Sequence, residues 1–171
     1  SSSSRGLGDV YKRQDLMINE FENIDLVIVN FYPFEKTLNN TSDHSKIIEN
    51  IDVGGPTMVR SAAKNYKDVT VITSSEQYAE LIDELNKYKG STSINFREKL
   101  SRIAFTETAY YDSVISDYFN KITHTNFPKK KVLHGNLIEI PRYGENPHQK
   151  SGIYSRKLEM DIKQIHGKQL S

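Results

Sequence analysis

The chain has 171 residues with no cysteine, 26% charged residues and a formal net charge of +1. The absence of cysteine excludes disulfides, thiolate nucleophiles and thiolate metal sites, and it is typical of a cytoplasmic protein. The near-neutral charge gives no general attraction for nucleic acid, and the apolar run within residues 24–31 is far shorter than the roughly 20 residues of a membrane span. We therefore expect small-molecule partners, with no nucleic acid and no membrane.

Both ends of the sequence look cut. Residues 1–14 begin with four serines and lack both the apolar core of a signal peptide and an amphipathic period. They are similar to translated adapter sequence, so we interpret them as a non-native leader and exclude them from the fold prediction. Residues 165–171 stop inside a segment that the pattern predicts to be structured. We expect the chain to be a fragment of a longer protein.

From residue 15 onward, helical and strand patterns alternate. Residues 15–22 have a short helical pattern, and 24–29 form a nearly continuous apolar run that predicts a strand buried on both faces. Pro33 ends this pattern, because proline disfavours helix before it and donates no ladder hydrogen bond. A second buried strand is predicted at 69–73.

Helical spacing predicts a helix over 42–50, whose apolar face is Ile47, Ile48 and Ile51. The turn Gly54-Gly55 is predicted to enter a second helix, with Pro56 at its first position and an end near residue 65.

Two further helices follow the second strand. Ser74 and Gln77 form a capping box for a helix through Tyr88, which Gly90 stops. A long helix is predicted over 93–120, because apolar residues recur there at helical spacing. These residues are Phe96, Leu100, Ile103, Ala104, Tyr111, Ile115 and Phe119.

Alternating strands and helices predict an α/β fold with a parallel sheet. The character changes over 121–131, which is polar, positive and contains Pro128. We place a domain boundary there.

The residues that leave the first predicted strand lie where parallel α/β sheets bind their ligands. Within 30–34, Tyr32 is a candidate hydrogen-bond donor to a substrate. The alternative is that this segment is an aromatic packing loop.

The segment 51–57 is the most informative. Gly54 and Gly55 precede a helix, so a ligand is able to approach the backbone, whose free N–H groups suit an anion or a developing oxyanion. Asp52 comes just before them, and its alternative role is a helix cap. Lys64 projects from the last turn of the same helix, where a solvated lysine also interacts favourably with the helix dipole.

A dense polar motif occupies residues 142–149 in a turn-rich setting. Arg142 and Tyr143 suit recognition of a phosphate and a flat heterocycle, because guanidinium binds phosphate oxygens bidentately and tyrosine stacks. His148 is alternatively a structural donor in the turn. The five histidines, at 44, 124, 134, 148 and 166, include no pair at metal-ligand spacing, so we expect no metal site.

Four segments in this order carry a family resemblance. They are 30–34 (Asn-Phe-Tyr-Pro-Phe), 50–65 (Asn-Ile-Asp-Val-Gly-Gly-Pro-Thr-Met-Val-Arg-Ser-Ala-Ala-Lys-Asn), 104–112 (Ala-Phe-Thr-Glu-Thr-Ala-Tyr-Tyr-Asp) and 142–149 (Arg-Tyr-Gly-Glu-Asn-Pro-His-Gln). Residues 15–171 closely resemble the bifunctional purine biosynthesis enzymes, which join IMP cyclohydrolase to AICAR transformylase (phosphoribosylaminoimidazolecarboxamide formyltransferase).

The resemblance implies that 15–125 are the C-terminal half of a methylglyoxal-synthase-like cyclohydrolase domain, with a partial parallel sheet and flanking helices. It implies a linker over 126–140 and the start of a second α/β domain, the transformylase, at 141–171. The full-length protein is then a cytoplasmic homodimer that uses 10-formyltetrahydrofolate as co-substrate and needs no metal for ring closure. We expect this chain to be inactive alone.

The implied cyclohydrolase reaction assigns roles to the residues singled out above. Asp52 is the proton acceptor, while Lys64 and Tyr32 supply a charged and a neutral donor. Asn30 and the backbone N–H groups of Val53 and Gly54 bind the substrate or its oxyanion, and Arg142 and Tyr143 bind the transformylase nucleotide. A non-catalytic module of the same architecture that binds a nucleotide or a phosphorylated metabolite is the alternative function.

Overall fold

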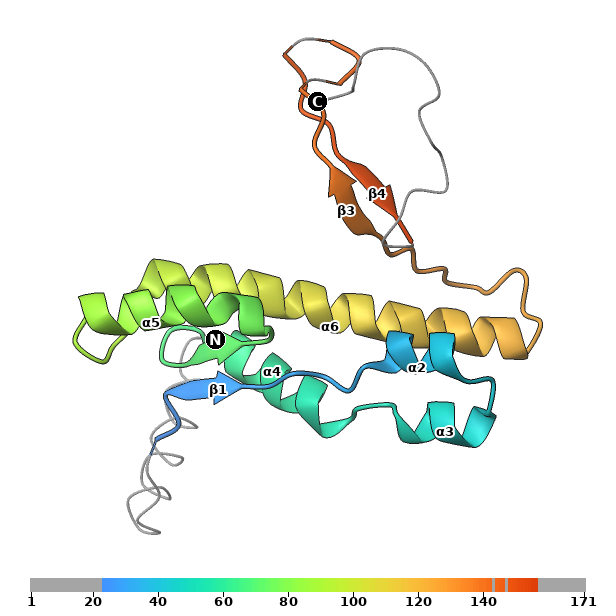
Figure 1. Ribbon diagram of the computed structural model, residues 1–171, viewed down its shortest axis with the longest axis horizontal. Helices are drawn as coiled ribbons and strands as arrows, with labels where there is room; N and C mark the ends of the chain where they lie inside the picture. Colours follow the sequence, from blue (N-terminus) through green and yellow to red (C-terminus); the bar gives the residue numbers. More distant parts are fainter. Residues whose placement is uncertain (1–22, 143, 147, 157–171) are drawn as a thin grey trace, which may run out of the picture. The chain divides into compact units, whose positions relative to one another are not determined.

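The computed structural model (Figure 1) describes residues 23–142, 144–146 and 148–156. These residues divide into two compact units. Of the described residues, 23–30 and 54–104 form the first unit, and 31–53 together with those described from 105 to 156 form the second. The helical pattern predicted at 15–22 and the end of the predicted transformylase segment lie outside the described residues.

The first unit contains a parallel pair of strands, β1 (Leu26–Ile28) and β2 (Thr70–Ile72), in which Val27 lies opposite Val71. The Thr70 N–H donates to the Asp25 carbonyl at 2.9 Å and the Val29 N–H donates to the Ile72 carbonyl at 3.0 Å, so the ladder continues at both ends. The α/β prediction with a parallel sheet is confirmed, since helices flank these strands.

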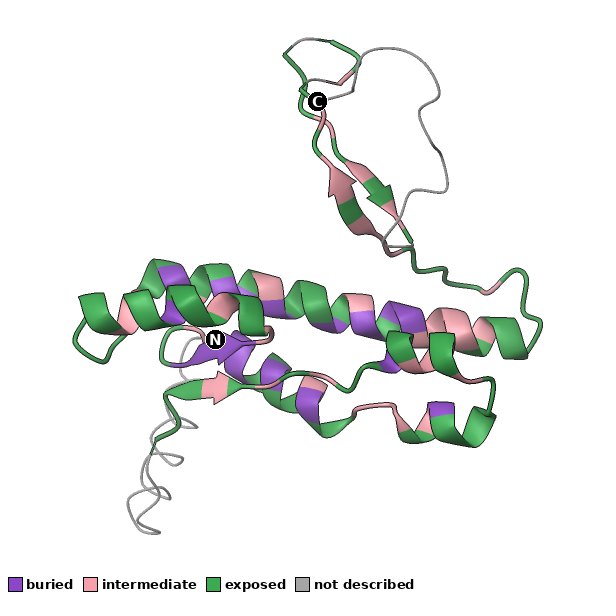
Figure 2. Ribbon diagram, viewed as in Figure 1, coloured by how far each residue is buried: buried purple, intermediate pink, exposed green. Residues whose placement is uncertain are grey.

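The two strands differ in burial (Figure 2). Every residue of β2 is buried, as predicted, but in β1 Leu26 is 38% exposed and Ile28 is 46% exposed. The prediction that this first strand is buried on both faces is therefore wrong for the described residues. Among these residues β1 pairs with one neighbour only, so its apolar run is not enclosed as it would be inside a wider sheet.

Helix α4 (Gly54–Lys64) packs on both strands through Val59, Ala62 and Ala63, which are buried. Small side chains at the contact let the helix approach the sheet closely. Pro56 is the third residue of the helix and not the first, but it still lies in the first turn, where N–H groups have no partner within the helix.

The predicted start and stop signals of the next helix are confirmed. Ser74 and Gln77 form the capping box, which opens the short 3₁₀ turn η1 (Ser75–Gln77) and then α5 (Tyr78–Lys87). Gly90 ends this segment in the left-handed region at φ +93°, a conformation that favours glycine, and its N–H donates to the Leu85 carbonyl at 2.8 Å.

Helix α6 (Ile94–Ile122) confirms the predicted long helix. Phe96, Leu100 and Ala104 are buried in the first unit, and Tyr111 is buried in the second. Phe119 is the exception, since it is 40% exposed. Its neighbour Tyr118 packs against the core cluster instead, and the Phe119 ring lies edge-on to the Tyr118 ring at 5.6 Å.

The second unit also contains α2 (Phe34–Asn40) and α3 (His44–Glu49). Asp43 caps α3 by accepting from the Ser45 and Lys46 N–H groups, and the buried Ile47 confirms the predicted apolar face. Helix α2 was not predicted from the sequence. The sequence pattern predicts that Pro33 ends regular structure, but proline is also tolerated at a helix start, and here it occupies the N-cap position of α2.

An antiparallel pair, β3 (Asn136–Glu139) and β4 (Ile153–Ser155), completes the second unit. Strand β3 lies within the range predicted as a linker, and residues 142–149 lie in the connection between β3 and β4. Each strand is short and the pairing contains an irregularity between Leu137 and Glu139, so neither carries a clear alternating pattern.

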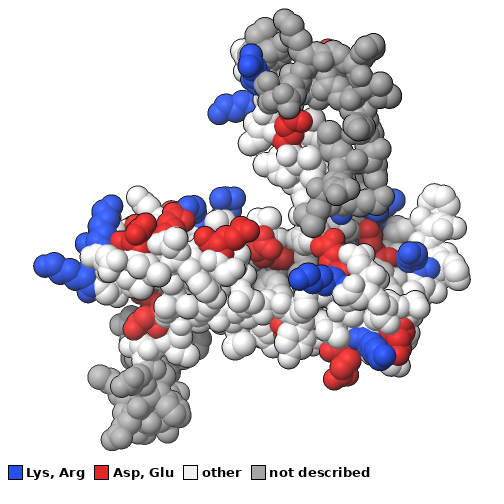
Figure 3. All heavy atoms as spheres, in the orientation of Figure 1, with Lys and Arg blue, Asp and Glu red and all other residues white. Residues whose placement is uncertain are grey.

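None of the described helices is long and apolar enough to cross a bilayer. On the face shown in Figure 3, Lys and Arg side chains lie among Asp and Glu side chains.

Candidate functional site

Two predicted site residues that are far apart in sequence meet in the second unit. Asp52 lies in the short segment between α3 and α4, and its Oδ2 accepts a hydrogen bond from the Tyr32 N–H at 3.3 Å. Tyr32 is 56% exposed, so this residue is accessible to a ligand. The structure thus joins the loop after β1 to the segment before α4 through the Asp52 carboxylate.

The backbone of Asp52 is held by Tyr111, which the helical spacing predicts only as a core residue. The Asp52 N–H donates to the Tyr111 hydroxyl at 2.9 Å, and this hydroxyl donates to the Asn50 carbonyl at 3.3 Å. Burial raises the pKa of Tyr111 above its ordinary value. The hydroxyl is therefore neutral and able to accept one hydrogen bond and donate the other at physiological pH.

The remaining predicted cyclohydrolase residues are exposed. Val53 is 73% exposed and directly precedes α4. A Cβ built on Gly54 would meet no heavy atom within 4 Å, so the first turn of α4 is open to a small group at this residue. Asn30 and Lys64 are exposed, and with Gly54 they belong to the first unit, whereas Tyr32, Asp52 and Val53 belong to the second.

A cavity of about 780 Å³ in the second unit is lined in part by Tyr32. Its wall combines tyrosine rings with both signs of charge, from Tyr110, Tyr111, Lys36, Glu107 and Arg156. A cavity with this lining suits a ligand that is partly aromatic and partly polar.

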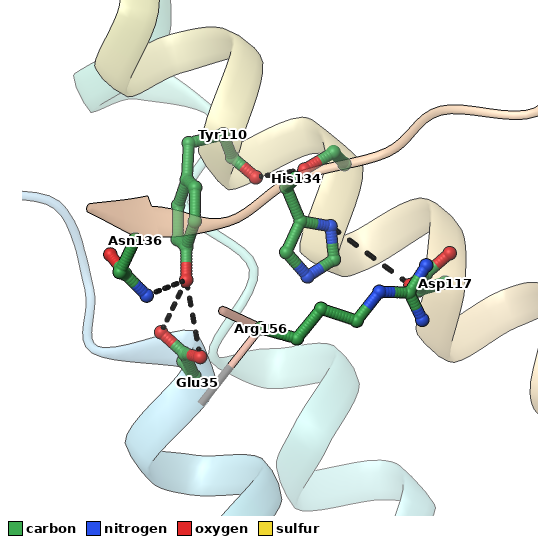
Figure 4. A network of polar contacts seen from close by, with 7 residues as sticks. Glu35, Tyr110, Asp117, His134, Asn136 and Arg156 are labelled. Carbon is green, nitrogen blue, oxygen red and sulfur yellow. Dashed lines mark hydrogen bonds and ion pairs between the residues drawn. The ribbon is translucent and has the colours of Figure 1, made fainter. Parts of the chain in front are cut away.

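A network of polar contacts beside this cavity joins β3 to α6 and α2 (Figure 4). The Tyr110 hydroxyl donates to the Glu35 carboxylate, with oxygen distances of 3.2 and 3.3 Å, and accepts from Asn136 Nδ2 at 3.0 Å. Burial, together with the nearby Glu35 charge, raises the pKa of Tyr110 even though the Asn136 hydrogen bond acts in the opposite direction.

The same network includes Asp117, to which Arg156 Nη1 approaches within 3.4 Å (Figure 4). His134 Nδ1 is 3.9 Å from the Asp117 carboxylate, which is longer than a hydrogen bond, and within the described residues this buried nitrogen has no hydrogen-bond partner. The His134 ring lies edge-on to the Tyr110 ring at 5.3 Å. Sequence reasoning missed this network, because its members are scattered along the chain and match no motif.

The described residues of the polar motif, which are 142, 144–146, 148 and 149, lie in the loop between β3 and β4. The Gly144 N–H donates to the Gln149 carbonyl at 2.8 Å, and the Asn146 N–H donates to Gln149 Oε1 at 3.1 Å. Arg142 and His148 are exposed, and Tyr143 lies outside the described residues. No group of three His, Asp or Glu side chains that could hold a metal ion occurs in the part of the chain that the structure describes.

Comparison with known proteins places this chain in a family. The model of the AICARFT/IMPCHase bienzyme family matches residues 62–171. The chain belongs to the AICARFT/IMPCHase bienzyme family. The match begins inside α4 and includes Lys64 and Arg142, whereas Tyr32 and Asp52 precede it.

Several curated relatives of this family extend the match toward the N-terminus. The bifunctional purine biosynthesis protein PurH of Bradyrhizobium diazoefficiens is 43% identical over 152 residues, or 86% of this chain and 29% of that protein. The PurH proteins of Listeria welshimeri and Elusimicrobium minutum are 43% and 41% identical over 159 and 170 residues, covering 31% and 33% of their own length. The chain thus spans about a third of the length of the relatives it matches.

A solved structure of a similar fold is described as the crystal structure of ForH. It superposes with a TM-score of 0.54 at 26% identity, over 70% of this chain and 59% of that one.

Proposed function

We propose that this chain is part of a bifunctional enzyme that carries out the last two steps of de novo purine biosynthesis. In these steps a formyl group passes from 10-formyltetrahydrofolate to AICAR nucleotide, and the product closes to IMP with loss of water. The contact between the Tyr32 N–H and the Asp52 carboxylate, within a chain of the AICARFT/IMPCHase bienzyme family, carries the proposal. The full-length protein is a cytoplasmic homodimer in this proposal.

The proposal divides the chain between two catalytic domains. Residues 15–125 belong to the cyclohydrolase, 141–171 begin the transformylase, and 126–140 connect them. We assign no residue of this chain to the folate site. Because the chain spans about 29% of the length of relatives such as the Bradyrhizobium protein, we expect it to catalyse neither reaction alone.

Ring closure needs a base and a group that stabilises negative charge. The carboxamide nitrogen of the formylated nucleotide attacks the formyl carbon and gives up one proton, and the formamido nitrogen gives up another as it forms a double bond to that carbon. The carbon–oxygen bond breaks, and the formyl oxygen leaves with these two hydrogens as water. Asp52 accepts the carboxamide proton in this proposal, and the hydrogen bond from the Tyr32 N–H to its carboxylate supports the assignment.

In this proposal, charge on the formyl oxygen is stabilised by backbone and side-chain donors. The backbone N–H groups of Val53 and Gly54 precede and open α4, where the open space at Gly54 leaves room for the substrate. Lys64, in the last turn of α4, contributes a cation and Tyr32 a neutral hydroxyl, and Asn30 is a further substrate-binding residue.

Paired variants of the full-length enzyme test this assignment. Asp52→Asn and Lys64→Ala are each expected to lower the rate of ring closure by about 10²-fold or more, the usual scale for a base or an oxyanion donor. Formyl transfer, measured on the same preparations, is expected to stay at the wild-type rate. Equal loss of both activities would instead mean that these residues only support the fold.

Arg142→Lys, in the loop between β3 and β4, tests the other activity, formyl transfer. Arg142 binds the phosphate of AICAR nucleotide in this proposal, with Tyr143 stacking on the base. The lysine ammonium is a point charge and cannot bind a phosphate bidentately as the planar arginine guanidinium does. We therefore expect a raised KM for AICAR nucleotide, an unchanged KM for the folate donor and a normal rate of ring closure. Titration of the nucleotide into both proteins decides the matter, because equal affinities would leave Arg142 with a role in the turn alone.

The alternative, a non-catalytic module that binds a nucleotide, gains no support from the described residues. Such a module needs an anion pocket but does not need a carboxylate fixed beside the loop that carries Tyr32.

A further inference from the structure

The hydroxyl of Tyr111 lies at the point where the candidate base is held. We propose that Tyr111 is a positioning residue for ring closure, which fixes the Asp52 carboxylate by holding the backbone turn that leads to it. This inference rests on the proposed function, because it gives Tyr111 a role only if Asp52 is the base.

The Tyr111 side chain is itself firmly placed. It is 8% exposed and belongs to the buried cluster that contains Phe34, Ile47 and Val114. Its ring centroid lies 5.2 Å from that of Phe31 and 6.2 Å from that of Phe34, in tilted and edge-on arrangements that aromatic rings favour. A long helix on one side and two aromatic rings on the other therefore set the position of the hydroxyl.

The hydroxyl closes the turn that precedes Asp52. It accepts from the Asp52 N–H at 2.9 Å and donates to the Asn50 carbonyl at 3.3 Å, so a single oxygen bridges the two ends of Asn50-Ile51-Asp52. This turn leads directly from the C-cap of α3 into α4. Without the bridge, the Asp52 N–H and the Asn50 carbonyl each lose this partner.

Tyr111 also contacts the other half of the site. The Tyr32 N–H that donates to the Asp52 carboxylate is the next backbone amide after Phe31, whose ring packs on Tyr111. The same side chain thus contacts both segments that the carboxylate joins, through its hydroxyl on one and its ring on the other.

The loss of the Tyr111 hydroxyl and the loss of the Asp52 carboxylate are expected to affect ring closure differently. The hydroxyl touches the backbone of Asp52 and is assigned no contact with the reacting atoms, so its loss displaces the base and leaves the substrate contacts in place. A displacement of about 1 Å lowers the rate of a positioned reaction by up to about 10²-fold. The expected signature is a lower kcat with an unchanged KM.

The test is Tyr111→Phe in the full-length enzyme, with ring closure and formyl transfer measured on one preparation. We expect kcat for ring closure to fall by about tenfold to a hundredfold, while KM for the formylated nucleotide and the rate of formyl transfer stay unchanged. The retained ring keeps the aromatic contacts, and formyl transfer reports that the protein is folded.

Tyr118→Phe is the matched control. Tyr118 lies on the same helix and packs on Phe34 at 6.0 Å, but its hydroxyl bonds His44 Nδ1 at 2.6 Å, away from Asp52. We expect Tyr118→Phe to leave kcat for ring closure at the wild-type value. Equal losses in the two variants would overturn the proposal in favour of a general loss of core stability.

A double variant separates this proposal from the one on which it rests. If Tyr111 acts through Asp52, adding Tyr111→Phe to Asp52→Asn lowers ring closure no further, because the residues act as a unit. If the double variant instead loses activity by the product of the two single-variant factors, the proposed role of Tyr111 is wrong, while Asp52 remains the base. Wild-type ring closure in Asp52→Asn alone would overturn both proposals.

Discussion

The interiors of the two units are stabilised by different kinds of contact. The first unit buries aliphatic and small side chains, among them Val59, Ala63 and Ile72, around a hydrogen-bonded pair of parallel strands. The second unit buries an aromatic cluster around Phe34 and Tyr111, and tyrosine hydroxyls connect its segments. Aliphatic packing tolerates small shifts, whereas a hydroxyl bonds its partner only within a narrow range of distance and angle.

The candidate base lies in the unit whose segments are connected by tyrosine hydroxyls. Asp52 belongs to the second unit, and its backbone and its carboxylate are both fixed by directional hydrogen bonds. The first unit has a directional contact of another kind, because the Arg97 side chain donates to the carbonyls of Tyr66, Lys67 and Thr92. The variants below separate packing from hydrogen bonding in each unit.

Phe34→Ala is expected to have the largest effect on stability. Phe34 is 1% exposed and lies at the centre of the aromatic cluster, so truncation costs about 3–5 kcal/mol through lost burial and the remaining cavity. Urea denaturation of the chain, followed by circular dichroism, measures this loss. Phe119→Ala is the control, because Phe119 is 40% exposed, and we expect about 1 kcal/mol or less. Similar costs at the two positions would contradict the assignment of the core.

Arg97→Met probes the directional contact of the first unit. The apolar stem is kept while hydrogen bonds from a charged group to three carbonyls are lost, so we expect the free energy of unfolding to fall by about 1.5–3 kcal/mol. Lys99→Met removes an exposed pair with Glu80 at 2.6 Å, and we expect about 0–1 kcal/mol for it. If both variants have the same stability, Arg97 is only a surface cation.

Tyr110→Phe is expected to have the smallest effect, and it depends on pH. Burial raises the pKa of Tyr110 above 10.0, so the fold favours the neutral hydroxyl. This stabilisation is fully present below the unfolded pKa of about 10 and is lost as the pH rises through the folded pKa.

We therefore expect the wild-type chain to lose stability above about pH 10 more steeply than Tyr110→Phe does. At neutral pH the lost hydrogen bonds of Tyr110 cost about 0.5–1.5 kcal/mol. Thermal unfolding between neutral and strongly alkaline pH measures both effects. If the two curves of stability against pH differ by the same amount at every pH, the prediction for Tyr110 is wrong. Burial also raises the pKa of Tyr111, but Tyr111 is present in both proteins and contributes equally to the two curves.

The sequence by itself determined the features that depend on neighbours a few residues away. The capping box of Ser74 and Gln77, the left-handed Gly90 and the long helix α6 follow from local hydrogen bonding and helical periodicity. The family is also encoded locally, in segments such as 142–149 whose order along the chain resembles one family of enzymes.

Only the tertiary structure decided which distant groups meet. The partner of the Asp52 N–H is 59 residues away in sequence, and the apolar period that places Tyr111 in the core says nothing about where its hydroxyl bonds. The exposed β1, the pairing of β3 with β4, and the Tyr110 network depend in the same way on the packing of separate segments. Hydrophobic periodicity specifies which face of an element is buried, but a hydrogen-bond partner is fixed only when two elements are brought together in space.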